Sequence, residues 1–241
     1  MISNNKESMY KRILLKLSGE VMAGSLGRGI EEPAALYIAN EVKAIKEAKK
    51  DIEIAVVIGA GNIFRGKENP HIERVKADYI GMMGTVINAM ALSSALEKIG
   101  VENTVMNVFS TGRYTELYNA LEGRKILKSK KVLILAGGTA SPYFTTDTTA
   151  SLRACELECE LLIKATKVDG LYTDDPVKNK DAKFIEKTTY LEVIEKNYNV
   201  MDITAVSMCN ENNIPLLICN LKKKGNVASF FKGDKIGSIV R

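Results

Sequence analysis

The chain has 241 residues, 46% of them hydrophobic, enough to bury a full core in one large α/β domain or two closely packed lobes. A mild net charge of +5, only 6% aromatic residues and no zinc-finger or RNA-recognition spacing argue against direct nucleic-acid binding. No stretch approaches the roughly eighteen apolar residues of a membrane span, and residues 1–9 read as a flexible tail, not a signal peptide. Four cysteines without a CxxC motif, and His71 as the only histidine, indicate reduced thiols, a cytoplasmic protein and no metal held by the chain itself.

Short apolar strands alternate with helical patterns through the first half of the chain. A proline at the start of the first helical pattern, Pro33, fits the first turn of a helix. In the long helix that follows the second strand, six residues are predicted to face the core: Val75, Tyr79, Met82, Met83, Val86 and Met90. The predicted elements are a strand at 12–17, a flexible loop at 24–29, a helix at 33–49, a strand at 54–58, a helix at 72–99 and a strand at 104–108.

The same alternation continues through the second half, interrupted by one long loop that Gly170 and Pro176 punctuate. Strands separated by ten or more residues of helix pair in parallel through right-handed crossovers. The sequence therefore predicts a three-layer α/β/α sandwich around a largely parallel central sheet. The predicted elements are helices at 115–128, 148–162, 190–196, 203–212 and 227–232, strands at 132–135, 161–165, 216–219 and 238–240, and the loop at 166–184.

No low-complexity linker divides the chain, so we expect a single domain of residues 1–241. Within it, an N-terminal lobe of about 10–160 and a C-terminal lobe of about 161–241 would share one continuous sheet.

The segment 137–147, GGTASPYFTTD, follows a buried strand and changes character abruptly. Gly137 and Gly138 permit a tight backbone turn, and threonine and serine hydroxyls line the rest of the loop. A helix starting after such a loop presents unpaired N–H groups that favour an anion such as phosphate. The segment therefore predicts a phosphate-ester pocket, although a loop that only caps its helix with Thr146 has the same composition.

Small and polar residues follow four predicted strands, at 16–19, 59–62, 137–139 and 166–170. Ligands of open parallel sheets bind outside the carboxyl ends of the strands, so this edge fits a polyphosphate or two phosphate-bearing ligands. The P-loop motif is absent, and Phe64 replaces the third glycine of a dinucleotide loop.

Two cations near these loops are candidate phosphate ligands. Arg65 offers a planar fork for bidentate binding, whereas a surface salt bridge is its alternative role. Lys16 lies between the apolar Leu15 and Leu17, and a buried amine there needs a partner.

Five segments in the same order, from Tyr10 to the end, resemble those of the bacterial UMP kinases, members of the amino acid kinase superfamily. The segments are KLSGE at 16–20, VVIGAGNIFRG at 56–66, ADYIGMMGTVIN at 77–88, GGTASPYFTTD at 137–147 and KATKVDGLYTDDP at 164–176. The resemblance implies transfer of the terminal phosphoryl group of ATP, as its magnesium complex, to UMP in pyrimidine nucleotide biosynthesis. It also implies inhibition by UTP and assembly into a homohexamer.

The resemblance further implies roles for individual residues. Lys16, Arg65 and Asp147 would be catalytic, with Asp147 organising the reaction centre, while Asp202 matches an acidic position of the family to which we assign no role. The ATP-binding residues would be Lys16, Leu17, Ser18, Gly19, Gly61, Arg65, Thr166, Tyr172 and Asp175. The UMP-binding residues would be Ala60, Asp78, Thr139, Ala140, Ser141, Pro142, Tyr143, Phe144, Thr145 and Thr146.

The chain also departs from the family pattern. Ala60 stands where many members have glycine, and Ala140-Ser141 where others have Gly-Asn. Ser93, Glu97 and Thr104 occupy positions that are basic in members activated by GTP, so GTP activation is not expected. Two alternative functions remain: a carboxylate or carbamate kinase of the same superfamily, and a nucleotide-sensing regulator without turnover.

Overall fold

The computed structural model describes residues 10–174, 176 and 178–241. The expected tail at 1–9 and the predicted ATP ligand Asp175 lie outside these residues. The strands are β1 Arg12–Leu17, β2 Glu53–Ile58, β3 Asn103–Asn107, β4 Glu116–Leu117, β5 Val132–Ala136, β6 Leu161–Thr166, β7 Leu171–Tyr172, β8 Phe184–Ile185, β9 Lys187–Thr188, β10 Leu216–Asn220 and β11 Ser238–Val240. The helices are η2 Gly19–Leu26, α1 Glu32–Ala48, η3 Gly66–Glu68, α2 Arg74–Lys98, α3 Ala120–Lys128, α4 Thr146–Glu156, α5 Tyr190–Glu195, α6 Ile203–Glu211 and α7 Asn226–Phe230.

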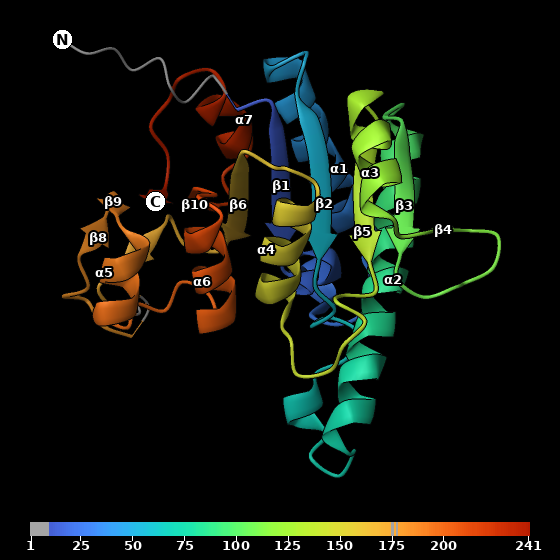
Figure 1. Cartoon of the computed structure of the whole chain (residues 1–241), viewed down its shortest axis with the longest axis horizontal. Helices are drawn as coiled ribbons and strands as arrows, with labels where there is room; N and C mark the ends of the chain where they lie inside the picture. Colours follow the sequence, from blue (N-terminus) through green and yellow to red (C-terminus); the bar gives the residue numbers. More distant parts are fainter. Residues whose placement is uncertain (1–9, 175, 177) are drawn as a thin grey trace.

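Nine strands form one continuous sheet in the order β4-β3-β5-β2-β1-β6-β10-β11-β9 (Figure 1). All of its described pairings are parallel except that between β10 and β11. The connection from β1 leads to β2 on one side, whereas that from β6 leads to β10 on the other, so the connections diverge between β1 and β6. This switch point, at the carboxyl ends of the two strands, is where a ligand of such a sheet is expected.

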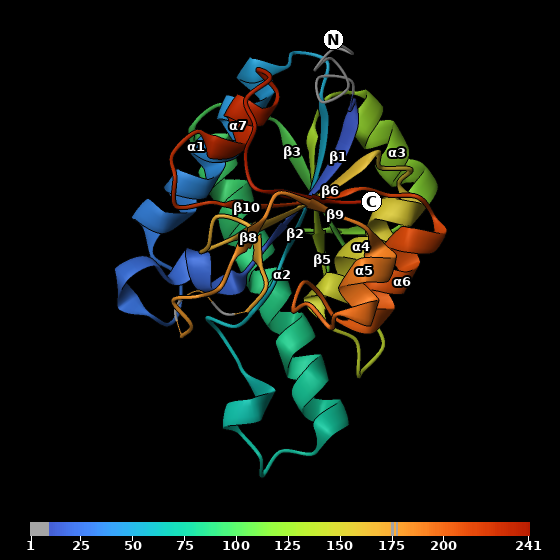
Figure 2. The same ribbon diagram turned by 90° about the vertical axis from the view of Figure 1, so that its left-hand side faces the viewer.

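Helices cover both faces of the sheet, which confirms the predicted three-layer sandwich (Figure 2). Alternate residues of β1 point to opposite faces, so Leu15 and Leu17 pack with α1, α2 and α7, whereas Leu14 packs on the side of α4 and α6. Two apolar cores result, one on each side of the sheet.

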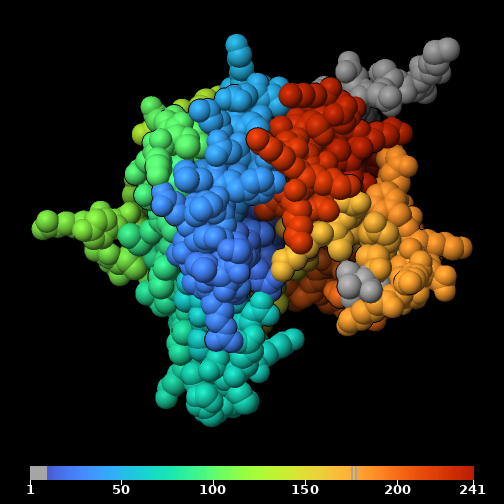
Figure 3. Space-filling view, turned by 180° about the vertical axis from the view of Figure 1, so that it is seen from behind, coloured from blue at the N-terminus to red at the C-terminus, as the bar shows by residue number. Residues whose placement is uncertain are grey.

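The long helix α2 extends beyond the body of the molecule, as Figures 1, 2 and 3 show. Of its six predicted core residues, Met82 and Val86 are buried, but the prediction is wrong for Tyr79, Met83 and Met90, whose side chains are exposed. The part of the helix that projects has no sheet to pack against, so its apolar residues remain uncovered.

By length and composition, α2 is also apolar enough to cross a membrane. It was not identified as such from the sequence, because no unbroken run of about eighteen apolar residues is present. Half of its most apolar window is buried inside the molecule, and the core helix of a soluble protein meets the same criterion. The helix alone is therefore weak evidence for a membrane span.

Other element boundaries also differ from the predictions. The helix predicted from Thr148 begins at Thr146, because the Thr145 hydroxyl caps it, and ends at Glu156, because Glu158 takes a left-handed turn with φ 58° before β6. The helix predicted from Thr115 begins only at Ala120, where the Asn119 side chain caps it. The predicted loop at 166–184 contains β7, which pairs with β8 in a short antiparallel hairpin.

Candidate active site

Two lysines lie side by side near the carboxyl ends of the central strands. Lys16 of β1 is in register with Lys164 of β6, and strand alternation directs both side chains to the face that carries α4. Their side chains are only 13% and 18% exposed. Two largely buried ammonium groups repel each other and require a nearby carboxylate.

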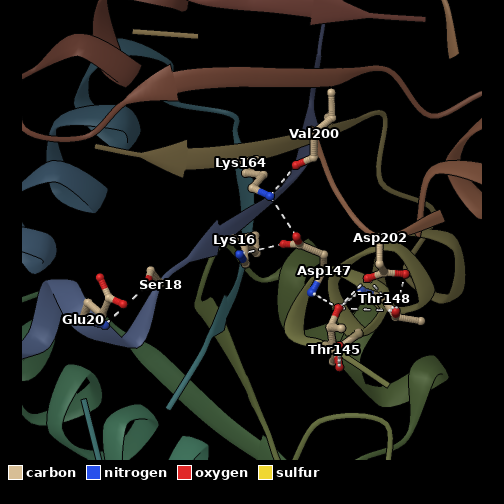
Figure 4. A network of polar contacts seen from close by, with 10 residues as sticks. Lys16, Ser18, Glu20, Thr145, Asp147, Thr148, Lys164, Val200 and Asp202 are labelled. Atoms are coloured by element: carbon tan, nitrogen blue, oxygen red, sulfur yellow. Dashed lines mark hydrogen bonds and ion pairs between the residues drawn. The ribbon is translucent and has the colours of Figure 1, made fainter. Parts of the chain in front are cut away.

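Asp147, in the first turn of α4, supplies this carboxylate (Figure 4). Its Oδ1 lies 2.6 Å from Lys16 Nζ, and its Oδ2 accepts a 2.8 Å hydrogen bond from Lys164 Nζ. Burial alone raises the pKa of Asp147, but the two ammonium groups outweigh it and lower the pKa below its ordinary value. Burial and the neighbouring Lys16 lower the pKa of Lys164, against the opposing effect of Asp147.

A second carboxylate, Asp202, fixes the helix that carries Asp147. Asp202 caps α6 through the amide of Ala205, and its oxygens accept hydrogen bonds from the hydroxyls of Thr145 and Thr148 (Figure 4). Thr145 Oγ1 in turn accepts from the amides of Asp147 and Thr148. The anion at the amino end of α4 is thus Asp202, and Thr145 instead of the predicted Thr146 is the capping residue.

One pocket, of about 280 Å³, lies between α2 and the loop that follows β5; we call it the α2 pocket. Asp78 of α2 holds this loop, since its Oδ2 accepts a 2.8 Å hydrogen bond from the backbone N–H of Tyr143. The same oxygen lies 2.7 Å from Nε of Arg74, whose guanidinium lies over the Tyr143 ring. Six of the predicted UMP ligands line the pocket: Ala60, Asp78, Thr139, Phe144, Thr145 and Thr146.

The other four predicted UMP ligands, residues 140–143, belong to the same loop but do not line the α2 pocket. Ala140 and Tyr143 adopt left-handed backbone conformations, with φ of 66° and 73°, which turn the loop sharply. The Tyr143 ring is exposed. The structure therefore brings these residues to the rim of the pocket and not to its wall.

A second pocket, of about 320 Å³, lies beyond β6 and the β7–β8 hairpin; we call it the β6 pocket. Thr166 and Tyr172, both predicted to bind the adenosine half of ATP, line it together with Lys164 and Tyr198. Thr146 lines the α2 pocket and Lys164 lines the β6 pocket, so Asp147, which follows Thr146 and binds Lys164, lies between the two pockets.

Arg65 lies on the rim of the same sheet edge, where it binds the Gly61 carbonyl and forms an ion pair with Glu20. Lys167 forms an ion pair with the same carboxylate at 2.5 Å, and this contact lowers the pKa of Glu20 below its ordinary value. Glu20 thus neutralises two cations on the rim.

The residues 17–19 after β1, predicted to face the ATP phosphates, differ in burial and in their contacts. The Leu17 side chain is fully buried, so only its backbone could meet a ligand. Gly19 packs closely on the next loop, where an added Cβ would lie 2.3 Å from the Gly59 carbonyl oxygen. The Ser18 hydroxyl accepts from the Glu20 amide at the start of η2, a helix whose end at 24–26 overlaps the flexible loop predicted at 24–29.

Sequence reasoning missed Lys164, although it resembles Lys16. Both lysines interrupt an otherwise apolar strand near its carboxyl end, so the burial argument used for Lys16 applies to Lys164 as well. The register that places them together cannot be read from one sequence. Asn62 and Asn88, whose side chains are buried behind the rim, were also given no role from the sequence.

Among the described residues, no group of three or more His, Cys, Asp or Glu side chains is arranged to hold a metal ion. The four cysteines are free thiols, and three of them are buried.

A largely parallel α/β sheet with two pockets and a pair of buried lysines near the carboxyl ends of its strands suits an enzyme that binds anionic small molecules. The model of the amino acid kinase family matches residues 11–220. The chain is 42% identical to the chloroplastic uridylate kinase PUMPKIN of Arabidopsis thaliana, over 96% of this chain and 68% of that protein. The chain belongs to the amino acid kinase family.

Solved structures agree with this assignment. The crystal structure of UMP kinase from Bacillus anthracis superimposes with a TM-score of 0.92 at 35% identity, covering 96% of both chains. UMP kinase from Ureaplasma parvum matches with a TM-score of 0.88 at 34% identity, covering 96% of this chain and 98% of the other.

Proposed function

We propose that the chain is a UMP kinase, which transfers the γ-phosphoryl group of ATP to UMP and forms UDP and ADP. Relatives with this activity share 34–42% identity with nearly the whole chain. The observation that supports the proposal most directly is the Lys16–Asp147–Lys164 cluster, which lies between the two pockets. A phosphoryl group that passes from one bound nucleotide to the other would cross this region.

In this proposal UMP occupies the α2 pocket. The Asp78 carboxylate would accept hydrogen bonds from the ribose hydroxyls, and the loop 139–146 would enclose the base and phosphate. ATP would place its adenosine half in the β6 pocket, beside Thr166 and Tyr172, and its phosphates along the backbone of 17–19 and 59–61. Asp175 remains a predicted contact on this side.

Phosphoryl transfer depends mainly on in-line placement and on stabilising the charge of a loose transition state. A phosphate oxygen of UMP is already an anionic nucleophile, so no general base is needed. Lys16 and Lys164 would neutralise the negative charge of the phosphoryl group in transfer. Arg65 would break its ion pair with Glu20 and bind phosphate oxygens instead. Asp147 would hold both ammonium groups in place instead of accepting a proton.

Magnesium would enter as part of the MgATP substrate and add its charge to that of the lysines. We further propose a cytoplasmic enzyme of pyrimidine nucleotide biosynthesis, inhibited by UTP binding in the α2 pocket. The N-terminal lobe of about 10–160 would carry the UMP site and the subunit contacts, and the C-terminal lobe of about 161–241 the ATP site.

We also propose a homohexamer in which exposed apolar residues of α2 contribute to a subunit interface. Such a row of apolar side chains along a projecting helix is suited to contact with a second copy. Light scattering during size-exclusion chromatography tests the assembly, and a monomeric protein would contradict it. The exposed residues are Tyr79, Ile80, Met83, Ile87 and Met90.

A coupled ADP-release assay with UMP, CMP, glutamate and carbamate as acceptors tests the reaction. UMP-dominated turnover is the expected result. Turnover with glutamate or carbamate would instead support the carboxylate or carbamate kinase, and no turnover together with tight UTP binding would support a nucleotide sensor.

A further inference from the structure

Two buried asparagines form a reciprocal amide pair behind the rim that carries Arg65. Asn88 of α2 is 0% exposed and Asn62, in the loop after β2, is 2% exposed. Asn88 Nδ2 donates to Asn62 Oδ1 at 2.7 Å, and Asn62 Nδ2 donates to Asn88 Oδ1 at 2.9 Å. Neither side chain lines the α2 pocket or the β6 pocket.

Each amide also holds a backbone carbonyl of a different loop. Asn88 Nδ2 donates to the carbonyl oxygen of Gly59 at 2.7 Å, and Asn62 Nδ2 donates to that of Gly29 at 2.7 Å. The backbone of Asn62 accepts in return from the Gly29 amide at 2.9 Å. The pair therefore ties α2 to the loop 59–62 and this loop to the segment that follows η2.

The tied loop has close neighbours on its other side. The Gly59 amide donates to the Leu17 carbonyl at 3.0 Å, and a Cβ on Gly19 would lie 2.6 Å from Asn62 Oδ1. A shift of the amide pair would therefore move the loops after β1 and β2 together. These are the two loops that follow β1 and β2 at the carboxyl ends of the strands, close in sequence to Lys16.

We propose that Asn62 and Asn88 are positioning residues for the phosphates of ATP, a role that rests on the proposed function. They do not touch the nucleotide; they fix the backbone of 59–61 at the spacing that the phosphates require. A fully satisfied buried amide network is rigid, and removing one donor leaves its buried partners unsatisfied. The cost of a loosened loop would therefore affect ATP binding first.

The test compares Asn88→Asp with Leu92→Ala, a buried control one turn further along α2. Asn88→Asp keeps the side-chain size but places a carboxylate oxygen against the Gly59 carbonyl, so the KM for ATP should rise about tenfold while the KM for UMP changes less. Leu92→Ala creates a cavity and lowers the Tm, but should leave both KM values unchanged. Asn62→Ala serves as a second variant should Asn88→Asp not fold, and it should also raise the KM for ATP.

An unchanged KM for ATP in the folded asparagine variants would overturn the proposal, as would an equal rise in Leu92→Ala. Wild-type turnover with UMP is measured first, so that failure of the proposed function is seen separately. Without such turnover, calorimetric titration with MgATP compares the same variants. The affinity for MgATP should then be about tenfold weaker in the asparagine variants and unchanged in Leu92→Ala.

Discussion

The amino and carboxyl ends of the central strands, which we call the amino edge and the carboxyl edge, carry the same charge motif, one carboxylate between two cations. At the carboxyl edge Asp147 lies between Lys16 and Lys164. At the amino edge Glu53 lies between Arg12, at 2.6 Å, and Lys130, at 3.2 Å. Arg12 and Lys16 belong to the same strand and point to the same face, so the two clusters lie at opposite ends of β1.

The clusters differ in how completely their groups are satisfied. Arg12 also donates to the Leu157 carbonyl at 2.6 Å, and its planar guanidinium is always charged. Lys164 likewise donates to the Val200 carbonyl, but Asp147 Oδ1 has no well-aligned hydrogen bond. We therefore expect the cluster at the amino end to serve stability, whereas the one at the carboxyl end keeps hydrogen-bonding capacity for a ligand.

Replacing one cation of β1 at a time gives the largest expected difference. Lys16→Met should lower turnover by about three orders of magnitude, because cationic stabilisation of phosphoryl transfer is worth that much. Arg12→Met should leave turnover within about twofold and lower the Tm instead. Steady-state rates and thermal unfolding of both variants test this, and loss of turnover in Arg12→Met would contradict the division between the edges.

The amino-edge carboxylate should matter for folding alone. Glu53 is 3% exposed, and Glu53→Gln removes the carboxylate that Arg12 and Lys130 share, leaving Arg12 with a longer ion pair to Glu158 at 3.7 Å, which we expect to cost about 2–3 kcal/mol of unfolding free energy. The KM values for ATP and UMP should not change. Urea unfolding monitored by circular dichroism gives the free energy, and a loss below about 0.5 kcal/mol would show that the pair is dispensable.

Replacing Arg65 tests whether the rim at the carboxyl ends of the strands binds ATP. Arg65→Ala removes a half-exposed side chain, so its Tm should stay close to that of the wild type, whereas the KM for ATP should rise about tenfold through loss of a charge-assisted hydrogen bond. Initial-rate kinetics and thermal unfolding measure the two effects. Equal losses of binding and stability would indicate a structural arginine.

Acid should weaken both clusters in the same direction. Burial raises the pKa of Glu53, but Arg12 and Lys130 outweigh it, so Glu53 and Asp147 both titrate below their ordinary values of 4.5 and 3.8. The unfolded chain then binds more protons than the folded chain, so stability rises with pH up to about pH 4–5 and is lost as pH falls through the lowered pKa values. The Tm of Glu53→Gln, measured from pH 2.5 to pH 7, should depend on pH less steeply than that of the wild type, and equal slopes would contradict this.

The smallest expected effect concerns the wall of the α2 pocket. A Cβ on Gly84 would lie 2.9 Å from Cβ of Ala60, so Gly84→Ala should displace the loop that carries Ala60 and raise the KM for UMP about threefold. Adding Ala60→Gly makes room again and should restore the KM. A double variant as impaired as Gly84→Ala would show that the two positions are independent.

The sequence predicted the central strands well, because the short apolar runs of β1 and β2 and the glycines after them are local signals. Phosphate binding at the carboxyl ends of these strands stays a prediction. It did not predict the partnership of Lys16 with Lys164, which depends on strand register. Nor could it separate Thr145 from Thr146 as the capping residue, since both have the same hydroxyl and are adjacent. Met83 and Met90 lie on an outward face of α2 although Val86, Ala89 and Leu92 near them are buried, and an apolar pattern alone does not show which face meets the core.

Asp202 lies at the amino ends of two helices that are far apart in the sequence, α4 at Thr146–Glu156 and α6 at Ile203–Glu211. Its bonds to Thr145 and Thr148 mean that α6 cannot slide or rotate against α4 without breaking them. A movement that opens one pocket relative to the other must therefore pivot at this corner or release it. We therefore expect Asp202 to hold the amino ends of α4 and α6 at a constant distance. Asp147, in the first turn of α4, would then keep its position between Lys16 and Lys164 during such a movement.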